Sequence, residues 1–183
     1  MQKYSMALVL IAGLAFSYGV RPAFDIGASW SHLSLSSYGY DDSEDVFALN
    51  IGTTVPYSPY VGLHAEVFAF RFNEITELSI GGGTDFMGIY GFGGKVGLIE
   101  MIPGRSNSPY FKQHLTLDRY SAEGSSITIF GIGVSAGIEF MSHSQMSPFI
   151  EGNFAYSTVG DEYYDLDITS FGFQGGVRLS WKK

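Results

Sequence analysis

Two serine–histidine neighbours are the residues of this chain whose types best suit nucleophilic catalysis. His143 precedes Ser144 in the stretch MSHSQMSP, and His32 follows Ser31 in the stretch SWSHL. An imidazole that reaches a hydroxyl acts as a general base when an acid orients its ring. His143 falls in an expected turn, and His32 has no evident acidic partner in the sequence. We therefore interpret both histidines as ordinary turn or interface residues and expect no enzyme.

Carboxylates gather in four polar stretches that contain no lysine or arginine. These stretches hold 12 of the 18 acidic residues of the chain. The acidic surface that we single out consists of Asp41, Asp42, Glu44, Asp45, Asp161, Glu162, Asp165 and Asp167. Such a surface would bind a divalent cation or a basic protein, although the spacing of a calcium loop is absent. Solvated loops with mutually repelling charges are the simpler interpretation.

The composition excludes several other chemistries. The chain has 183 residues and no cysteine, which rules out a disulfide framework, a thiolate metal site and a cysteine nucleophile. The chain has 18 acidic and ten basic residues, so it lacks the excess of positive charge that would neutralise a phosphate backbone. We therefore do not expect nucleic acid as a partner. The glycine-rich run from Gly81 to Gly94 lacks the Lys and Ser/Thr of a phosphate loop. We expect this run to be a flexible loop leading into a glycine-lined strand, and we assign no cofactor.

The first 19 residues have the layout of a secretory signal peptide. Lys3 precedes an apolar run from about Met6 to Phe16, and small residues follow it. Cleavage after Ser17 and cleavage after Gly19 fit equally well. The run is too short for a membrane-spanning helix, which needs about 20 apolar residues. We expect residues 20–183 to form one exported domain.

The elements that position these residues are β-strands, because large and small side chains alternate along most of the chain. In FGIGVSAGIEF, residues 130–140, one parity is Phe, Ile, Val, Ala, Ile, Phe and the other is Gly, Gly, Ser, Gly, Glu. A period of two places successive side chains on opposite faces of a strand. We therefore predict an all-β domain with strands over residues 22–36, 45–55, 60–72, 86–102, 110–120, 126–141, 149–157 and 168–181.

A short Ser-Pro-aromatic repeat marks alternate connections between these strands. It starts at Ser58, Ser108 and Ser147, each just before or at an expected strand start, where a proline does least harm to the hydrogen-bond ladder. The four polar stretches occupy the other connections. Tight turns that alternate with longer loops, and an even number of strands, predict an eight-stranded antiparallel up-and-down barrel that closes on itself.

Side-chain volume decides which face of this barrel points inward. The interior of an eight-stranded barrel is just wide enough to be filled by side chains, so it cannot hold a large residue at every second position of every strand. The small parity, such as Gly131, Gly133 and Gly137, is therefore expected inside and the large parity outside. A continuous apolar outer face would aggregate in water, and it is typical of a transmembrane barrel.

Aromatic residues near the expected strand ends are placed to form girdles at the two membrane interfaces. They are Trp30, Tyr60, Phe68, Phe70, Phe72, Tyr110, Tyr120, Phe149, Tyr156 and Trp181. In the third strand the alternation slips, because large residues at Val61, Leu63 and Val67 give way to Phe68 and Phe70. We expect a β-bulge at this point.

The inward parity carries charges of both signs, which we expect to form a polar network inside the barrel. Its members are Asp25, His64, Glu66, Lys95, Lys112, His114, Asp118, Glu139, Glu151 and Arg178, with Asn153 and Gln174 among them. These charges should pair, because an unpaired buried charge is strongly destabilising. A lumen plugged by salt bridges and trapped water is the favoured interpretation, and a narrow ion path and a proton relay are the alternatives.

Residues 20–183 resemble the small eight-stranded outer-membrane β-barrels of the OmpX/OmpA type. The resemblance rests on the signal peptide, the proline-marked turns, the longer polar loops and the last strand, FGFQGGVRLSW, which ends on an aromatic residue. Lys182 and Lys183 depart from the family pattern, in which the chain usually ends on that aromatic. The resemblance implies a Gram-negative outer membrane, with extracellular loops and both termini in the periplasm. Implied partners are membrane lipid, lipopolysaccharide, the barrel-assembly machinery and an extracellular protein ligand.

The role implied by this resemblance is non-enzymatic. It is structural, or a surface interaction such as adhesion or envelope defence through the acidic loops. Three alternatives belong to other classes of protein: a narrow pore for ions or small solutes, a lipid-modifying outer-membrane hydrolase that uses Ser31 or Ser144, and a soluble lipocalin-like carrier. The carrier would need the aromatic face inside.

Overall fold

The computed structural model describes nine segments of the chain. They are residues 22–37, 40–72, 78–80, 84–86, 90–104, 106–122, 125–142, 144–161 and 164–180. The expected signal peptide, residues 1–19, lies outside these described residues. Within the described residues, no helix has the length and apolar character needed to cross a membrane.

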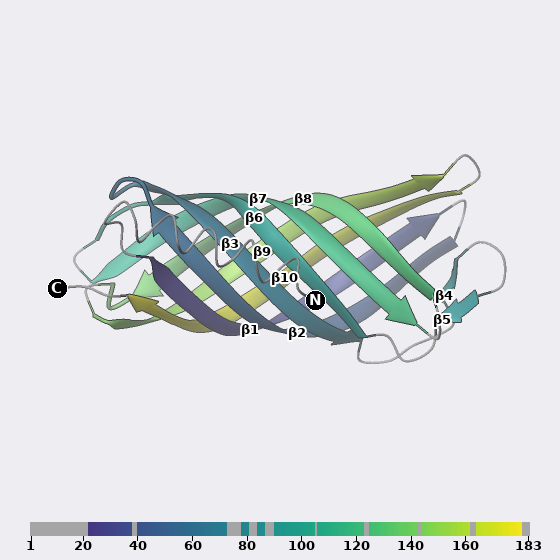
Figure 1. The fold of residues 1–183 in the computed structure, drawn as a ribbon, viewed down its shortest axis with the longest axis horizontal. Coiled ribbons are helices and arrows are strands. Elements are labelled where there is room, and N and C mark those ends of the chain that lie inside the picture. The colour runs from purple at the N-terminus through teal and green to yellow at the C-terminus, as the bar shows by residue number, and fades with distance from the viewer. Residues whose placement is uncertain are drawn as a thin grey trace.

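Eight strands form one closed barrel (Figure 1). They are β1 (Ala23–Ser37), β2 (Tyr40–Pro56), β3 (Val61–Phe72), β6 (Tyr90–Met101), β7 (Asn107–Ala122), β8 (Ser125–Phe140), β9 (Met146–Asp161) and β10 (Tyr164–Ser180). Each strand is antiparallel to its neighbours along the chain, and β10 pairs back onto β1. The predicted all-β, eight-stranded up-and-down barrel is confirmed.

The two ends of the barrel differ. We call the end at which β1, β3, β7 and β9 finish the loop end, and the opposite end the turn end. At the loop end, β4 (Leu78–Ile80) and β5 (Thr84–Phe86) form a separate two-stranded sheet in a segment that we expected to be a loop. Figure 1 shows this small hairpin and the barrel's C-terminus at opposite ends of the molecule. Phe86, predicted to start the fourth barrel strand, belongs to β5 instead.

Several strands extend further toward the loop end than the sequence pattern predicts. β1 and β2 remain paired as far as Ser37 and Tyr40, so Asp41, Asp42, Glu44 and Asp45 lie on a strand rather than in a loop. The physical reason is that a hairpin ladder is held by backbone hydrogen bonds, which polar residues make as well as apolar ones. Hydrophobic alternation marks only the part of each strand whose outer face is apolar.

The turn end is tied by the serines of the Ser-Pro repeat. The Ser58 hydroxyl accepts hydrogen bonds from the backbone N–H groups of Tyr60 and Val61 at 3.1 and 3.0 Å. The Ser108 hydroxyl accepts from the Gly104 N–H at 3.2 Å, and the Ser147 hydroxyl donates to the Met141 carbonyl at 3.1 Å. The repeat is therefore a turn motif in which the serine satisfies backbone groups that the turn leaves free.

The outward side chains of the eight strands form an apolar outer wall. Large residues on it are widely exposed, for example Leu49 at 71%, Phe130 at 70% and Leu115 at 61%. The alternate residues point inward, and the buried ones include many polar and charged side chains. The molecule thus has an apolar outside and a largely polar inside.

β3 runs without a bulge, so the predicted bulge is wrong. Its register with β2 is unbroken from Val46–Phe72 to Pro56–Gly62, and its register with β6 is equally regular. Phe68 and Phe70 therefore keep the parity of His64 and Glu66 and point into the barrel. Their large rings fit because a glycine lies directly opposite each of them on β6.

Candidate functional site

The turn-end half of the barrel interior is filled by a network of ion pairs. Arg178 on β10 donates two hydrogen bonds to Asp25 on β1, from Nε at 2.7 Å and from Nη2 at 2.8 Å. Its Nη1 donates to Glu139 on β8 at 2.9 Å. All three side chains are buried. A planar guanidinium that binds one carboxylate with two bonds and a second with one fixes three strands relative to one another.

A second cation, Lys112 on β7, completes this layer. Its Nζ lies 2.6 Å from Oε2 of Glu151, which also accepts a hydrogen bond from the Tyr110 hydroxyl at 3.0 Å. The Tyr110 ring lies between the two cations, with Lys112 Nζ 5.2 Å and Arg178 Cζ 5.3 Å from its centroid. This geometry is that of cation–π contacts.

His64 on β3 joins this layer to Thr54 on β2, and its imidazole is neutral. Its Nε2 lies 3.4 Å from Lys112 Nζ, and its Nδ1 lies 3.0 Å from the Thr54 hydroxyl. Because an ammonium group only donates hydrogen bonds, Nε2 must accept, which places the imidazole proton on Nδ1. The proton then points to the Thr54 oxygen.

Glu66 is the centre of the next layer toward the loop end. Its two oxygens accept hydrogen bonds from Asn50 Nδ2 at 3.1 Å and Gln174 Nε2 at 2.8 Å. Lys95 Nζ lies 3.2 Å from its Oε1. Ser29 in turn donates to Asn50 at 3.1 Å. A buried carboxylate with this many donors is held in one position.

The predicted inward charges are therefore brought together, except for Asp118 and His114. Asp118 forms no ion pair within the described part of the chain, and Asn153 and His114 make no side-chain hydrogen bond there. Three cations, Lys95, Lys112 and Arg178, face five carboxylates, those of Asp25, Glu66, Asp118, Glu139 and Glu151. Of these five, Asp118 is the carboxylate that forms no ion pair within the described residues, although Lys95 acts on it from a greater distance.

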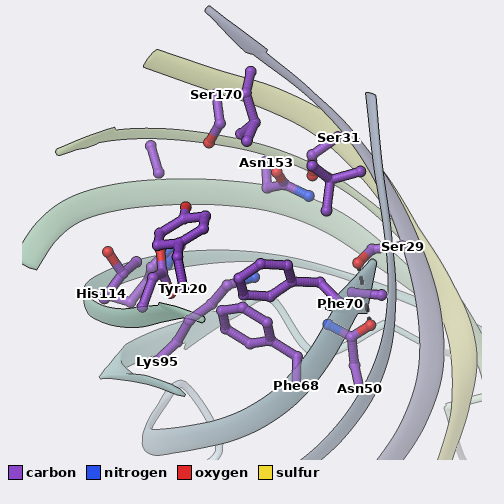
Figure 2. A pocket seen from close by; sticks show the side chains of 16 residues that line it. Ser29, Ser31, Asn50, Phe68, Phe70, Lys95, His114, Tyr120, Asn153 and Ser170 are labelled. Atoms are coloured by element: carbon purple, nitrogen blue, oxygen red, sulfur yellow. Dashed lines mark hydrogen bonds between the residues drawn. The ribbon is translucent and has the colours of Figure 1, made fainter. Parts of the chain in front are cut away.

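A small chamber lies between this network and the loop end (Figure 2). Its volume is about 80 Å³, which is enough for a few water molecules. Ser29, Ser31, Asn50, Lys95, Asn153 and Ser170 contribute to its polar lining. Three consecutive inward residues of β7 also line it, and each has a buried polar atom without a protein partner: His114 Nε2, Thr116 Oγ1 and Asp118 Oδ1. These atoms suit hydration by trapped water.

An apolar cluster lines the loop-end side of the chamber. Phe70 packs with the buried Leu33 and Val46, and its ring centroid lies 5.1 Å from that of Tyr120 and 6.0 Å from that of Phe68. Figure 2 shows the rings of Phe68, Phe70 and Tyr120 beside Lys95. A second group, Leu35, Ile129 and Ile168, packs beyond Tyr120. We call these two groups the loop-end cluster.

Five of the ten predicted girdle aromatics are inside the barrel, which corrects that prediction. Phe70, Tyr110 and Phe149 are buried, and Phe68 and Tyr120 are partly buried among inward residues. Each lies directly opposite an inward glycine on a neighbouring strand: Phe68 opposite Gly93, Phe70 and Tyr120 opposite Gly91, Tyr110 opposite Gly137, and Phe149 opposite Gly176. A Cβ atom at Gly91 or Gly93 would overlap the phenylalanine ring that faces it.

Three of the five remaining girdle residues are described, and all three lie outside the barrel interior. Trp30 and Tyr156 belong to the outer wall, and Tyr60 is exposed in the turn before β3. Trp30 stacks on Phe173 with ring centroids 6.4 Å apart and meets Phe171 edge-on at 6.1 Å. The side chains of Phe72 and Trp181 lie outside the described part of the chain.

His32 has an acidic partner, contrary to the sequence analysis. Its Nδ1 lies 2.9 Å from Oδ1 of Asp45, which is directly opposite on β2. The pair belongs to the outer wall, next to the ring of Phe171. Ser31 points to the other side of β1 and lines the chamber, so it does not form a catalytic triad with this pair. His143, the other histidine considered for catalysis, lies outside the described residues.

The acidic surface is only partly described. Asp41 and Asp167 are exposed and both pair in register with Ser36 of β1. Asp42 and Glu44 are partly buried, and Asp167 accepts a hydrogen bond from the Tyr156 hydroxyl at 2.7 Å. The side chains of Asp161 and Asp165, and all of Glu162, lie outside the described part. The members of this acidic surface that are described all lie at the loop end.

Comparison with known proteins shows a shared fold. No protein-family model matches the sequence, and no curated protein matches it. Neisserial surface protein A (NspA) is a similar solved structure, with a TM-score of 0.60 and 18% identity over 87% of this chain and 99% of that chain. The outer membrane protein OprG from Pseudomonas aeruginosa has a TM-score of 0.56 and 10% identity over 90% of this chain and 98% of that chain.

The chain therefore has the fold of the small eight-stranded outer-membrane β-barrels, and the resemblance inferred from its sequence is confirmed as a likeness of fold. Such a likeness does not by itself decide what the protein does.

Proposed function

We propose that the protein spans a Gram-negative outer membrane as a closed barrel and has a non-enzymatic, structural or surface-interaction role. The observation that carries this proposal is the outer wall. Large apolar residues such as Leu49, Phe130 and Phe173 are more than half exposed, and side chains of this kind occur on all eight barrel strands. In water such a band would drive aggregation, whereas in lipid it is the stable arrangement.

The interior supports a structural role rather than transport or catalysis. In the described part of the chain, ion pairs fill the turn-end half, and the small chamber and the loop-end cluster follow it toward the loop end. Buried charges that are each held by several partners make an interior rigid. A rigid barrel is a suitable support for binding surfaces at its loop end.

The acidic surface is the binding surface that we assign to this role. Asp41 and Asp167 are exposed at the loop end, and Asp45 is 43% exposed on the same side of the barrel. Exposed carboxylates attract a basic partner and speed its encounter, most strongly at low salt. In our proposal the loop end is extracellular, and the turn end and both termini are periplasmic.

Two measurements test the membrane placement. Mature protein from detergent-extracted membranes should migrate differently in SDS gels before and after boiling, because a closed barrel resists SDS until it is heated. Single-cysteine variants of this cysteine-free chain should then give its orientation: Ser36→Cys, at the loop end, should react with a membrane-impermeant maleimide on intact cells. Ser106→Cys, in an exposed turn at the other end, should react only after the outer membrane is permeabilised.

Each measurement has an outcome that contradicts the proposal. Solubility without detergent, together with one gel mobility in both conditions, would favour the soluble-carrier alternative. A mobility shift with reversed labelling would retain the membrane barrel and overturn its orientation.

A further inference from the structure

Gln113 is a polar side chain in the apolar outer wall of β7. Along the strand, its outward neighbours are Phe111 and Leu115. Across the sheet, it lies opposite Leu98 on β6 and Val134 on β8. All four neighbours are exposed on the outer wall, as is Gln113 itself.

This environment sets Gln113 apart from the other polar residues of the wall. His32, Asp45 and Asp167 stand beside further polar groups near the loop end, where they contact one another or Tyr156. Glu100 also has four apolar neighbours, but it lies one residue from the end of β6, next to a turn. Thr53 on β2 has four apolar neighbours too, but it is buried and its hydroxyl donates to the Ala23 carbonyl at 3.2 Å. Among the described residues, Gln113 is the exposed polar side chain that combines full apolar surroundings with a place well inside its strand.

A broad groove surrounds Gln113 on the outer wall. Its volume is about 870 Å³, and β3, β6, β7, β8 and β9 all contribute to it. Leu98, Leu115, Ile132 and Val134 line it together with the Gln113 amide. The groove is therefore mostly apolar. Tyr156 and His114 also line it, but the Tyr156 hydroxyl donates to Asp167, and His114 belongs to the inward parity of β7.

The amide has no hydrogen-bond partner among the described residues. A primary amide carries two N–H donors and a carbonyl acceptor, and hydrocarbon chains satisfy none of them. A lipid carbonyl would accept from the N–H groups and leave the amide oxygen unsatisfied. A second Gln113 amide satisfies both kinds of group at once.

We propose that two copies of the protein associate in the membrane through this groove, with the two Gln113 side chains paired across a twofold axis. In a twofold interface the same residues meet themselves, so each Nε2 donates to the Oε1 of the other copy. Side-chain hydrogen bonds and close packing are the forces that join membrane-spanning segments in lipid. The exposed leucine, isoleucine and valine side chains of the two grooves supply the packing. This inference rests on the proposed membrane placement.

The experiment leaves Gln113 unchanged and places a cross-linking thiol at the next outward residue of β7, Leu115. Leu115→Cys is introduced into the cysteine-free chain, and native membranes are treated with a short thiol-specific bifunctional cross-linker. We expect a cross-linked dimer on reducing gels. Adding Gln113→Leu should lower the yield of this dimer about fivefold to tenfold. The reason is that two side-chain hydrogen bonds between membrane-spanning segments change the association constant by up to about tenfold.

Two controls make the result specific. Ala28→Cys places the thiol on the exposed wall of β1, four strands from β7 in either direction around the barrel, and should give no dimer. The heat-dependent gel mobility should be the same for all variants, because Gln113→Leu removes a polar group from an apolar wall and leaves the interior unchanged.

The outcomes separate this proposal from the one on which it rests. Absence of the Leu115→Cys dimer, or a dimer yield that Gln113→Leu does not change, overturns the Gln113 interface. Either result with a retained mobility shift leaves the membrane barrel intact. Loss of the mobility shift in the unmodified protein would instead overturn the membrane placement itself.

Discussion

At the scale of single residues, Arg178 is the side chain on which the interior depends most. It is the cation for both Asp25 and Glu139, and all three groups are buried. Removing one member of a buried ion pair leaves an uncompensated charge and costs about 3–5 kcal/mol. We expect Arg178→Met to lower the free energy of unfolding by about this amount, measured by urea titration in lipid vesicles.

A matched variant separates lost charge from lost packing at this position. Arg178→Met leaves the carboxylates of Asp25 and Glu139 without their cation. Adding Asp25→Asn removes one of these two charges and should recover part of the lost stability. A double variant no more stable than Arg178→Met alone would show that the buried carboxylate is not the source of the loss.

At the scale of elements, the pairing of an inward aromatic with an inward glycine joins adjacent strands. Gly91 on β6 lies opposite both Phe70 on β3 and Tyr120 on β7. A methyl group at Gly91 would overlap the Phe70 ring, and overpacking of this kind costs about 1–3 kcal/mol. We expect Gly91→Ala to lower the midpoint temperature of the heat-dependent gel shift.

The compensating change at the facing residue provides the control. Phe70→Leu shortens the side chain that meets the new methyl group, so the double variant should be more stable than Gly91→Ala alone. Additive losses in the double variant would mean that the two residues do not share this contact.

The same pairing explains which parts of the fold could be predicted from sequence. Alternation of large and small residues was sufficient for the strand count, the closure and the inward charges. It failed for Phe68, Phe70, Tyr110, Tyr120 and Phe149, because the size of a side chain was judged without the residue opposite. Space inside a narrow barrel is shared between neighbouring strands, so an aromatic fits wherever its partner is glycine.

The pair of His32 and Asp45 was missed for a related reason. Cross-strand partners depend on the register, and the register depends on where the hairpin turns. The structure pairs Ser37 with Tyr40, and this register brings His32 opposite Asp45. Expecting a longer acidic loop between β1 and β2 concealed the contact.

At the scale of the whole molecule, the layers of the interior argue against a continuous ion path. The turn-end network, the chamber and the loop-end cluster follow one another along the barrel axis, and the side chains of the first and last are largely buried. We expect the purified protein to give no unitary conductance steps in planar lipid bilayers. Regular steps, reduced when a larger side chain replaces Gly133, would support the narrow-pore alternative.

The ion pair between Arg178 and Asp25 has a further consequence, for the order of assembly. The two residues are 153 positions apart and join the first and last strands of the chain. Contacts this distant in sequence form late, because a long stretch of chain must be ordered before they meet. Until β10 arrives, Asp25 and Glu139 lack the Arg178 cation, and the half-built sheet carries an unpaired negative charge, that of Asp25, on its open edge strand β1. Closing the barrel and neutralising that edge are therefore a single cooperative event, and a chain truncated before β10 should stall as a charged intermediate rather than insert.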